Sequence, residues 1–431
     1  MDYKAALFLI CTVVIFSYLF DLIARRTRFP SVVLLIGLGL SGRLLADYFG
    51  YKVPYLDQIL PSLGKIGLIL IVLEAALELR ITREKRGLIW RSFLSAWILL
   101  IATALGLAYV FYHYLGMMSF RLALIYAIPL SVISSAVAIP SVSGLSAGKK
   151  EFIVYESTFS DILGVILFNF VRNNAAYDLR SFVKLGGDTL IIFVAAIVIA
   201  YFLLELLDRI AHHVQFFLLL SILVIFYLIG DKLHLPALII IFFFGLAMSN
   251  LEALVPGALR KYTQHLRRTE AELHRFFLLS AESAFLVRTF FFLAFGYSID
   301  IQKFSNWQNY SYAGIVLSIL FALRFLYLYL TQRKNVLPQG FIAPRGLISV
   351  LLFLGIPAAL KQVPGFVPDA HFLLLIILGS MFVMLYGTLR FGHGDAQLKN
   401  DENPGGEKGI DETTQPLPDS GIRDGANDWV N

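Results

Sequence analysis

The sequence contains little of what a catalytic or disulfide-stabilised protein needs. Cys11 is the one cysteine, so no intramolecular disulfide can form and helix packing must hold the fold. The eight histidines are scattered, and neither an HExxH pattern nor a glycine-rich phosphate loop beside a lysine is present. No nucleophile with a neighbouring base is visible. We therefore expect neither an enzyme nor a resident cofactor.

Charge is also scarce, and long apolar runs take its place. Only 15% of the 431 residues are charged, whereas 58% are hydrophobic and the mean hydropathy is +0.73. This composition is typical of an all-α polytopic membrane protein. Runs of roughly 17–25 apolar residues, the length that crosses a ~30 Å hydrocarbon core, predict about 13 transmembrane helices. Their expected bounds are 5–24, 29–46, 60–79, 90–115, 121–146, 150–172, 185–208, 214–230, 234–250, 275–298, 310–331, 337–361 and 370–390.

Basic residues concentrate in alternate loops between these spans. The positive-inside rule places those loops in the cytoplasm, the N-terminus outside and, with an odd number of spans, the C-terminus in the cytoplasm. The net charge of +6 then reflects topology and does not indicate a nucleic-acid partner. The first span lacks a small-residue cleavage site, so we expect a retained helix in the cell membrane. The basic loops hold Arg25, Arg26 and Arg28; Arg80, Arg83, Lys85 and Arg86; Lys149 and Lys150; Arg260, Lys261, Arg267 and Arg268; and Arg333 and Lys334.

Two polar segments lie outside the spans. The connector at 251–275 alternates apolar residues with cations, which fits either an amphipathic helix on anionic lipid or an ordinary solvated loop. Residues 391–431 are rich in Asp, Gly and Pro and poor in large apolar residues. We expect a disordered tail there, following a transporter domain at 1–390.

Helix-breaking residues interrupt two of the expected spans. Broken membrane helices line cavities, because their freed backbone groups need side chains, water or an ion. If spans 1–6 and 8–13 form two halves of the molecule, the broken span is the fifth of the six spans in each half. This arrangement predicts two inverted-topology repeats whose broken helices cross near the midplane, with the site there. The breaking residues include Pro140, beside Ser134 and Ser135, in one span, and Pro344, Arg345 and Gly346 in the other.

Two carboxylates lie in the sixth span, within the stretch YESTFSD. An acid in the middle of a membrane helix costs roughly 2.5–3.5 kcal/mol on insertion scales, so Glu156 and Asp161 need a partner or a task. They lie about 140° apart around the helix, which indicates different roles. Ser157 lies one turn from Asp161. A partly desolvated carboxylate that a cation can reach exchanges protons for cations, although Asp161 could instead hydrogen-bond a neighbouring helix.

Three intramembrane arginines could neutralise Glu156. They are Arg288, Arg324 and Arg345. Arginine keeps its charge when buried and can bind a carboxylate in a bidentate manner. A pair such as Glu156 with Arg324 would fix helices together and would not itself transport an ion.

The order of these features resembles the monovalent cation:proton antiporter superfamily, and within it the sodium/proton exchanger branch. The likeness rests on a broken helix, the Glu-Ser-x-x-x-Asp helix, "FFFLAFGYSID", an Arg-bearing helix and a second broken helix with Arg-Gly. The resemblance implies that Asp161 binds cation and proton, that Ser160 replaces the usual Asn, and that Glu156 pairs with Arg324. Arg288 lies where electrogenic relatives carry a basic residue facing the site. The family further implies a homodimer, in which a scaffold at about 5–79 and 214–298 supports a mobile core at about 90–172 and 310–390 that moves like an elevator.

This sequence departs from that branch in the first broken helix. The usual Thr-Asp-Pro is absent, and the nearest matches are Ala138-Ile139-Pro140 or, read against the potassium branch, Ser134-Ser135-Ala136. We expect exchange of a monovalent cation, Na+ first and then K+ or Li+, for protons, and no bound metal other than this cation. The alternative is a transport-inactive relative that acts as a membrane scaffold or an ion or pH sensor. The expected ligands are Asp161, Ser160, Ser157, Ser134 and Ser135, with Arg288 and Arg345 as charges that could face them.

Overall fold

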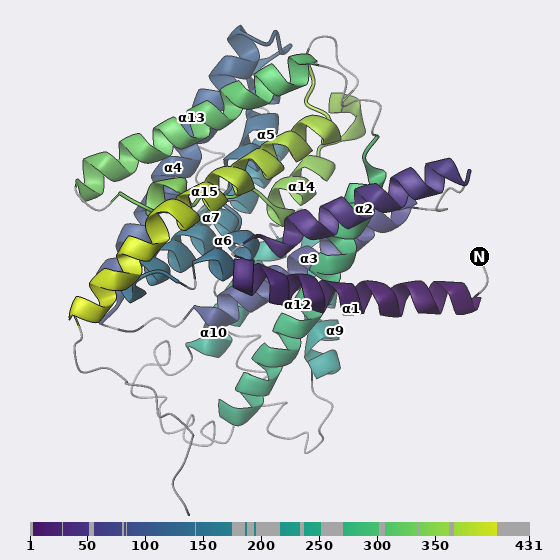
Figure 1. The fold of residues 1–431 in the computed structure, drawn as a ribbon, viewed down its shortest axis with the longest axis horizontal. Helices are drawn as coiled ribbons and strands as arrows, with labels where there is room; N and C mark the ends of the chain where they lie inside the picture. Colours follow the sequence, from purple (N-terminus) through teal and green to yellow (C-terminus); the bar gives the residue numbers. More distant parts are fainter. Residues whose placement is uncertain are drawn as a thin grey trace, which may run out of the picture.

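A computed structural model describes most of the chain. The described residues are 3–27, 29–50, 56–79, 82, 84–142, 144–174, 186–187, 194, 216–232, 237–250, 270–300, 307–333, 336–361 and 366–402. Over these ranges the chain is helical and contains no β-strand (Figure 1). The expectation of an all-α fold is therefore confirmed.

One group of helices packs around α3 and α12. Its closest contacts join α2 and α3 to α12, and α3 to α10. At the crossing of α2 and α12, a Cβ on Gly39 would lie 2.1 Å from the carbonyl oxygen of Leu293, and one on Gly296 would lie 2.4 Å from that of Ile36. Glycine at both positions lets the two backbones touch. The group consists of α1 (Tyr3–Thr27), α2 (Ser31–Tyr48), α3 (Leu56–Glu78), α9 (Phe216–Lys232), α10 (Ala237–Ser249) and α12 (Glu270–Ser298).

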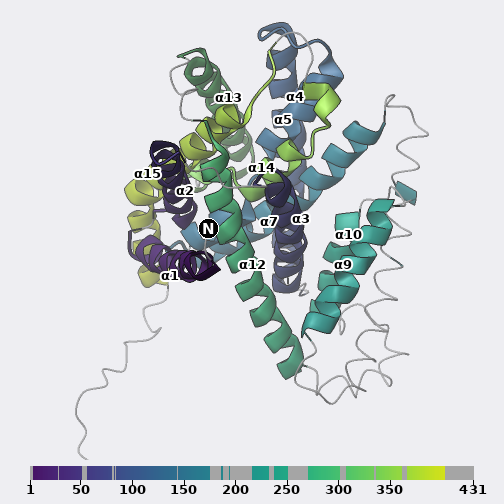
Figure 2. The same cartoon turned by 90° about the vertical axis from the view of Figure 1, so that its right-hand side faces the viewer.

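The remaining helices form a second group. Here α4 packs on α5, α7 and α13, and α13 packs on α15. Figure 2 shows α4, α5 and α13 at the end of the molecule opposite to α9. This group consists of α4 (Arg86–His113), α5 (Phe120–Ser131), α6 (Ser135–Ser141), α7 (Ala147–Asn173), α13 (Trp307–Gln332), η3 (Gln339–Phe341), α14 (Leu347–Leu354), η4 (Ala358–Lys361) and α15 (Ala370–Glu402).

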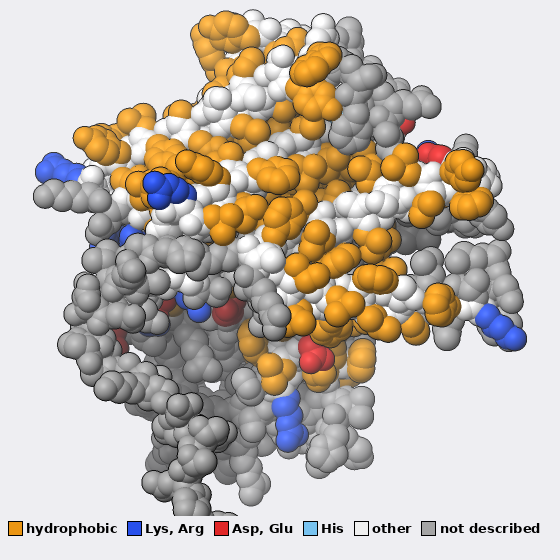
Figure 3. Space-filling view, in the orientation of Figure 1, with side chains coloured by type: hydrophobic (Ala, Val, Ile, Leu, Met, Phe, Trp, Pro, Cys, Tyr) orange, Lys and Arg blue, Asp and Glu red, His pale blue; other side chains and the backbone are white. Residues whose placement is uncertain are grey.

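The described helices suit a membrane. Seven of them are long and apolar enough to cross one, and one face of the molecule is covered largely by hydrophobic side chains with few charged ones (Figure 3). Twelve of the 13 expected spans coincide with described helices or broken helices, whereas the span at 185–208 lies almost entirely outside the described residues. The count of 13 therefore stays a prediction. The predicted amphipathic helix also falls mostly outside, at 251–269.

The last helix is longer than the sequence predicts. We expected the polar tail to begin at 391, but α15 continues to Glu402. The added segment contains helix-forming residues such as Ala396, Gln397 and Leu398, and no proline occurs before Pro404. The boundary of the expected tail is therefore wrong by a dozen residues, and residues 403–431 lie outside the described part.

Candidate functional site

The first broken span is interrupted between α5 and α6. Val132 and Ser134 have extended backbone, so the helix stops after Ser131 and restarts at Ser135. Two backbone N–H groups freed by the break have partners, since Ile133 donates to the Ser160 hydroxyl (2.9 Å) and Ser134 donates to the Pro344 carbonyl (2.9 Å). The break is thus stabilised from α7 and from the second broken span.

Pro140 is not the position of this break. The structure places it inside α6, one residue before the last. Proline at this position removes the N–H that would bond to the carbonyl of Ala136, and α6 ends one residue later, at Ser141. The assignment of Pro140 as the break is therefore wrong, and Pro344 and Gly346 do lie in the second break, between η3 and α14.

The two breaks touch each other. A Cβ on Gly346 would lie 2.5 Å from the hydroxyl oxygen of Ser134, so only glycine fits at this crossing. The Arg345 side chain reaches from the second broken span to the first, where its Nε donates to the carbonyl of Leu130 (2.6 Å) near the end of α5. Helix carbonyls in the last turn have no intrahelical partner, and a cation stabilises them.

Arg345 is fully enclosed by these contacts. Its side chain is 2% exposed, a second guanidinium nitrogen donates to the carbonyl of Ala343 (2.8 Å), and its backbone N–H donates to the Ser380 hydroxyl (2.9 Å). The contacts described for Arg345 therefore stabilise the crossing, and none of them reaches Asp161.

Asp161 of α7 lies at the start of α6. Its Oδ2 accepts hydrogen bonds from both the backbone N–H (3.1 Å) and the hydroxyl of Ser135. Its Oδ1 is equally buried but has no hydrogen-bond partner within the described part of the chain. Because burying a polar oxygen without a partner costs free energy, Oδ1 is suited to a proton or a cation.

The serines expected around Asp161 have separate contacts. Ser135 is the one that bonds to the carboxylate, whereas the Ser160 hydroxyl accepts from the break. The Ser157 hydroxyl donates to the carbonyl of Ile153 in its own helix. The Ser134 hydroxyl lies against Gly346. Among the described hydrogen bonds, Ser157 and Ser134 are therefore not joined to Asp161.

Glu156 and Arg324 form a buried ion pair. The Arg324 guanidinium donates to both carboxylate oxygens, at 2.8 Å and 3.3 Å, and the two side chains are 1% and 2% exposed. Ser95 of α4 donates to the same carboxylate at 2.6 Å, and Arg324 also donates to the Gln339 carbonyl at 3.1 Å. The pair thus connects α7, α13, α4 and η3.

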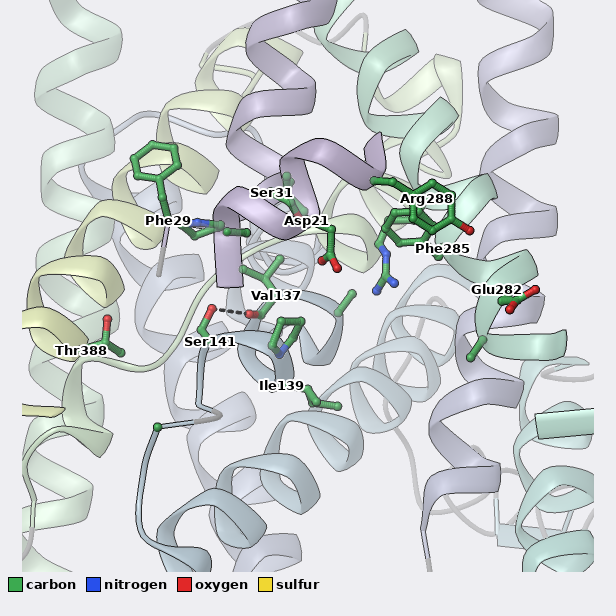
Figure 4. A pocket seen from close by; sticks show the side chains of 18 of the residues that line it. Asp21, Phe29, Ser31, Val137, Ile139, Ser141, Glu282, Phe285, Arg288 and Thr388 are labelled. Atoms are coloured by element: carbon green, nitrogen blue, oxygen red, sulfur yellow. Dashed lines mark hydrogen bonds between the residues drawn. The ribbon is translucent and has the colours of Figure 1, made fainter. Parts of the chain in front are cut away.

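A cavity of about 460 Å³ separates α6 from the first group of helices (Figure 4). Its walls include Ala136 and Val137 of α6, directly after Ser135, and Arg288 and Glu282 of α12. Figure 4 shows the Arg288 side chain extending from α12 toward Val137. The cavity therefore borders the residue next in sequence to Ser135, which bonds to Asp161.

Sequence reasoning missed several of these groups. Nothing near Ser95 or Ser380 marks them as hydrogen-bond partners of the Glu156 carboxylate and of the Arg345 backbone N–H, because a serine in an apolar helix is common and each partner lies at least 35 residues away. A signal for the role of Arg345 did exist. A helix that ends inside the membrane leaves its last carbonyls without partners, and a nearby cation such as Arg345 can bind them.

The comparisons with known proteins identify the family. The family model "Sodium/hydrogen exchanger, transmembrane" matches residues 10–390. A structure of the sodium proton antiporter MjNhaP1 from Methanocaldococcus jannaschii at pH 8 is similar, with a TM-score of 0.64 and 18% identity over 93% of this chain and 100% of that one.

An electron microscopy map of the same antiporter gives a TM-score of 0.64 and 19% identity, covering 93% of this chain and 98% of that one. At such low identity these structures show the fold alone. The comparison with curated proteins gives no match. The family match covers most of the chain and concerns transporters rather than enzymes. The chain therefore belongs to the sodium/hydrogen exchanger family of multi-pass membrane antiporters, which exchange a cation for protons.

Proposed function

We propose that this antiporter exchanges one monovalent cation, Na+ first and then K+ or Li+, for one proton at Asp161. The observation that carries the proposal is the buried Oδ1 of Asp161, which has no hydrogen-bond partner within the described residues while Oδ2 is held by Ser135. A cation or a proton can bind at Oδ1, but each weakens binding of the other. By linkage this competition is reciprocal, and reciprocal competition is what couples the two fluxes.

The other site residues support Asp161 indirectly. We propose that Glu156 and Arg324 hold the helices around α7 in place and carry no ion. Ser160 keeps the break open by accepting from Ile133, and Ser135 positions the carboxylate. Ser134 and Ser157 remain candidate ligands, because a hydroxyl can rotate toward a bound cation.

The cavity is the proposed route for ions. The turn between α1 and α2, which borders it, follows the basic residues at 25–28, and the positive-inside rule places this end in the cytoplasm. The site is then reached from the cytoplasm in this conformation. Movement of the group containing α4–α7 and α13–α15 against the group containing α1–α3, α9, α10 and α12, like an elevator, would open it to the other side.

The proposal is tested by cation-driven pH change in proteoliposomes. Wild-type protein, Asp161→Asn and Asp47→Asn are compared with Na+, K+ and Li+ in turn. Asp47 is a matched control, because it is a half-exposed carboxylate paired with Arg43 at the surface. We expect wild type and Asp47→Asn to exchange at least one cation for protons and Asp161→Asn to exchange none. Full exchange by a folded Asp161→Asn protein would contradict the proposal.

The alternative is a transport-inactive relative that acts as a scaffold or sensor. The absence of the Thr-Asp-Pro motif favours it, since fewer side chains are then available to hold a cation. A well-folded wild-type protein that moves none of the three cations would support this alternative.

We also propose that the protein is a homodimer in the cell membrane. Cys11, the one cysteine of the chain, is exposed on α1 in the proposed scaffold group. Because two-fold symmetry would bring the same surface of both copies together, a bismaleimide should link two copies through Cys11. Cys11→Ser is the control, and a monomer by light scattering would exclude the dimer.

A further inference from the structure

The cavity beside α6 contains charges that the exchange chemistry does not use. Arg288 and Glu282 both project from α12, and they are six residues apart, which corresponds to about 9 Å along the helix axis. Since α12 begins at Glu270 on the proposed cytoplasmic side, Glu282 lies nearer the mouth and Arg288 nearer the inner end. Asp21 of α1 also borders the cavity.

Arg288 differs from the other arginines of the membrane region. Arg324 is paired with Glu156, and Arg345 is bound to carbonyl groups. Within the described part of the chain, Arg288 forms neither an ion pair nor a side-chain hydrogen bond, although its charge acts on Glu74 of α3. Its side chain extends into the cavity toward α6 (Figure 4). An unpaired intramembrane cation that faces a water-accessible space is costly and therefore a candidate for a functional role.

A cation moving inward would meet these charges in sequence. It would first pass the carboxylates of Glu282 and Asp21, which attract it, and would then face the fixed positive charge of Arg288 before reaching Asp161 behind α6. Charges in a cavity with low-dielectric walls act over longer distances than at an open surface. Arg288 therefore opposes occupation of the inner end by a cation.

We propose that Arg288 is a positioning residue that sets the apparent cation affinity of the cytoplasm-facing site by electrostatic repulsion, without binding cation or proton itself. The inference rests on the proposed function of Asp161. The charge of Arg288 acts on Glu74 of α3, and the carboxylates of Asp21 on α1 and Glu282 on α12 border the same cavity. Their negative charges offset part of the repulsion.

The test measures the apparent KM for Na+, K+ and Li+ in everted membrane vesicles, whose outer surface is the cytoplasmic face. We expect Arg288→Gln to lower the KM roughly three- to tenfold, and Arg288→Lys, which keeps the charge, to match wild type. Glu282→Lys should raise the KM. Added choline chloride should reduce the difference between Arg288→Gln and wild type, because salt screens charges in water-filled space over about 10 Å.

Arg275→Gln is the matched control. Arg275 is an exposed arginine on the same helix, 13 residues before Arg288 or about 20 Å along the axis, and it does not border the cavity. Its substitution should leave the KM unchanged.

The outcomes separate this inference from the proposed function. An unchanged or raised KM in folded Arg288→Gln, while wild type exchanges cations, overturns the inference alone. Absence of wild-type exchange overturns the proposed function and this inference with it. If Arg288→Gln does not fold, Glu282→Lys decides, since an unchanged KM there also overturns the inference.

Discussion

The carboxylate of Asp161 has two unlike oxygens. Oδ2 accepts two hydrogen bonds from Ser135, and Oδ1 accepts none from the described residues. Hydrogen bonds from neutral donors stabilise the ionised carboxylate, whereas burial favours the protonated one. In the exchange proposed for Asp161, the balance between cation and proton would therefore be set at Oδ2, on the side of the carboxylate where Ser135 lies.

Removing the Ser135 hydroxyl should shift the pH dependence of exchange. Ser135→Ala deletes one donor to the ionised carboxylate, so the proton is held more tightly and a higher pH is needed to release it. We expect half-maximal exchange to move upward by roughly one pH unit, the equivalent of one hydrogen bond to a charged group. The measurement is the exchange rate in proteoliposomes as a function of pH.

Ser131→Ala is the control for this shift. Its hydroxyl donates to the Ala127 carbonyl within α5, so its loss should leave the pH profile in place. A Ser135→Ala profile identical to that of wild type would show that Ser135 does not tune the carboxylate.

The ion pair of Glu156 with Arg324 should matter for stability. Glu156→Gln leaves a fully buried guanidinium without its counter-charge, and breaking a buried pair in this way costs about 3–5 kcal/mol. We expect a large fall in the thermal unfolding midpoint of the purified protein. Ser95→Ala, which removes one hydrogen bond to the same carboxylate, should lower the midpoint far less. Equal effects of both variants would contradict this role.

Among the elements, the contact of α2 with α12 gives the sharpest test of packing. Gly39→Ala would place a methyl group 2.1 Å from the Leu293 carbonyl oxygen, so the helices must separate and the unfolding midpoint should drop. Gly37→Ala is a matched control on the same helix, because nothing lies within 4 Å of its Cβ position. It should be neutral or slightly stabilising. A tolerated Gly39→Ala would mean that this crossing is looser than described.

The elements were predictable where a strong local signal existed. Long apolar runs predicted the helices, because a membrane span must satisfy its own backbone hydrogen bonds. The exact break in the first broken span was not predictable from proline, since Pro140 fits into α6 and the break depends on Ser160 and Pro344 from distant segments. Helix formers after Gly394 likewise extended α15 beyond the apolar run.

The same reasoning applies to the site. Glu156 and Asp161 were recognisable because an acid in lipid needs compensation. The contact of Arg345 with Leu130 joins residues 215 positions apart and has no local signature. The cavity depends on how α1, α6 and α12 pack, so no sequence motif marks it.

For the whole molecule, the buried charges predict the electrical character of transport. The second helix group buries four ionic side chains among its described residues, namely Glu156, Arg324, Asp161 and Arg345. The charges of Glu156 and Arg324 cancel, so the four buried side chains sum to zero when Asp161 is ionised. The same four side chains and their bound ion carry one positive charge when Asp161 holds either a proton or a monovalent cation. The two loaded states therefore have equal charge, which predicts electroneutral exchange.

Electroneutral exchange can be tested in the proteoliposomes used for cation-driven pH change. With K+ and valinomycin used to impose a membrane potential, the rate of Na+-driven pH change should not depend on that potential. Solid-supported membrane recordings should show no sustained current. A current that reverses with the potential would require a second transported charge and would rule out one-for-one exchange.

The hydrogen bond from Ser134 to Pro344 and that from Arg345 to Leu130 tie the two broken helices to each other. In the elevator movement proposed above, the two breaks would then shift together, so the surroundings of Asp161 would be the same on either side of the membrane. On that proposal, the moving part itself would give the site equal cation affinity on the two sides. A difference in apparent cation affinity between the sides would come from stationary side chains such as Arg288, which the site would meet on one side of the membrane only.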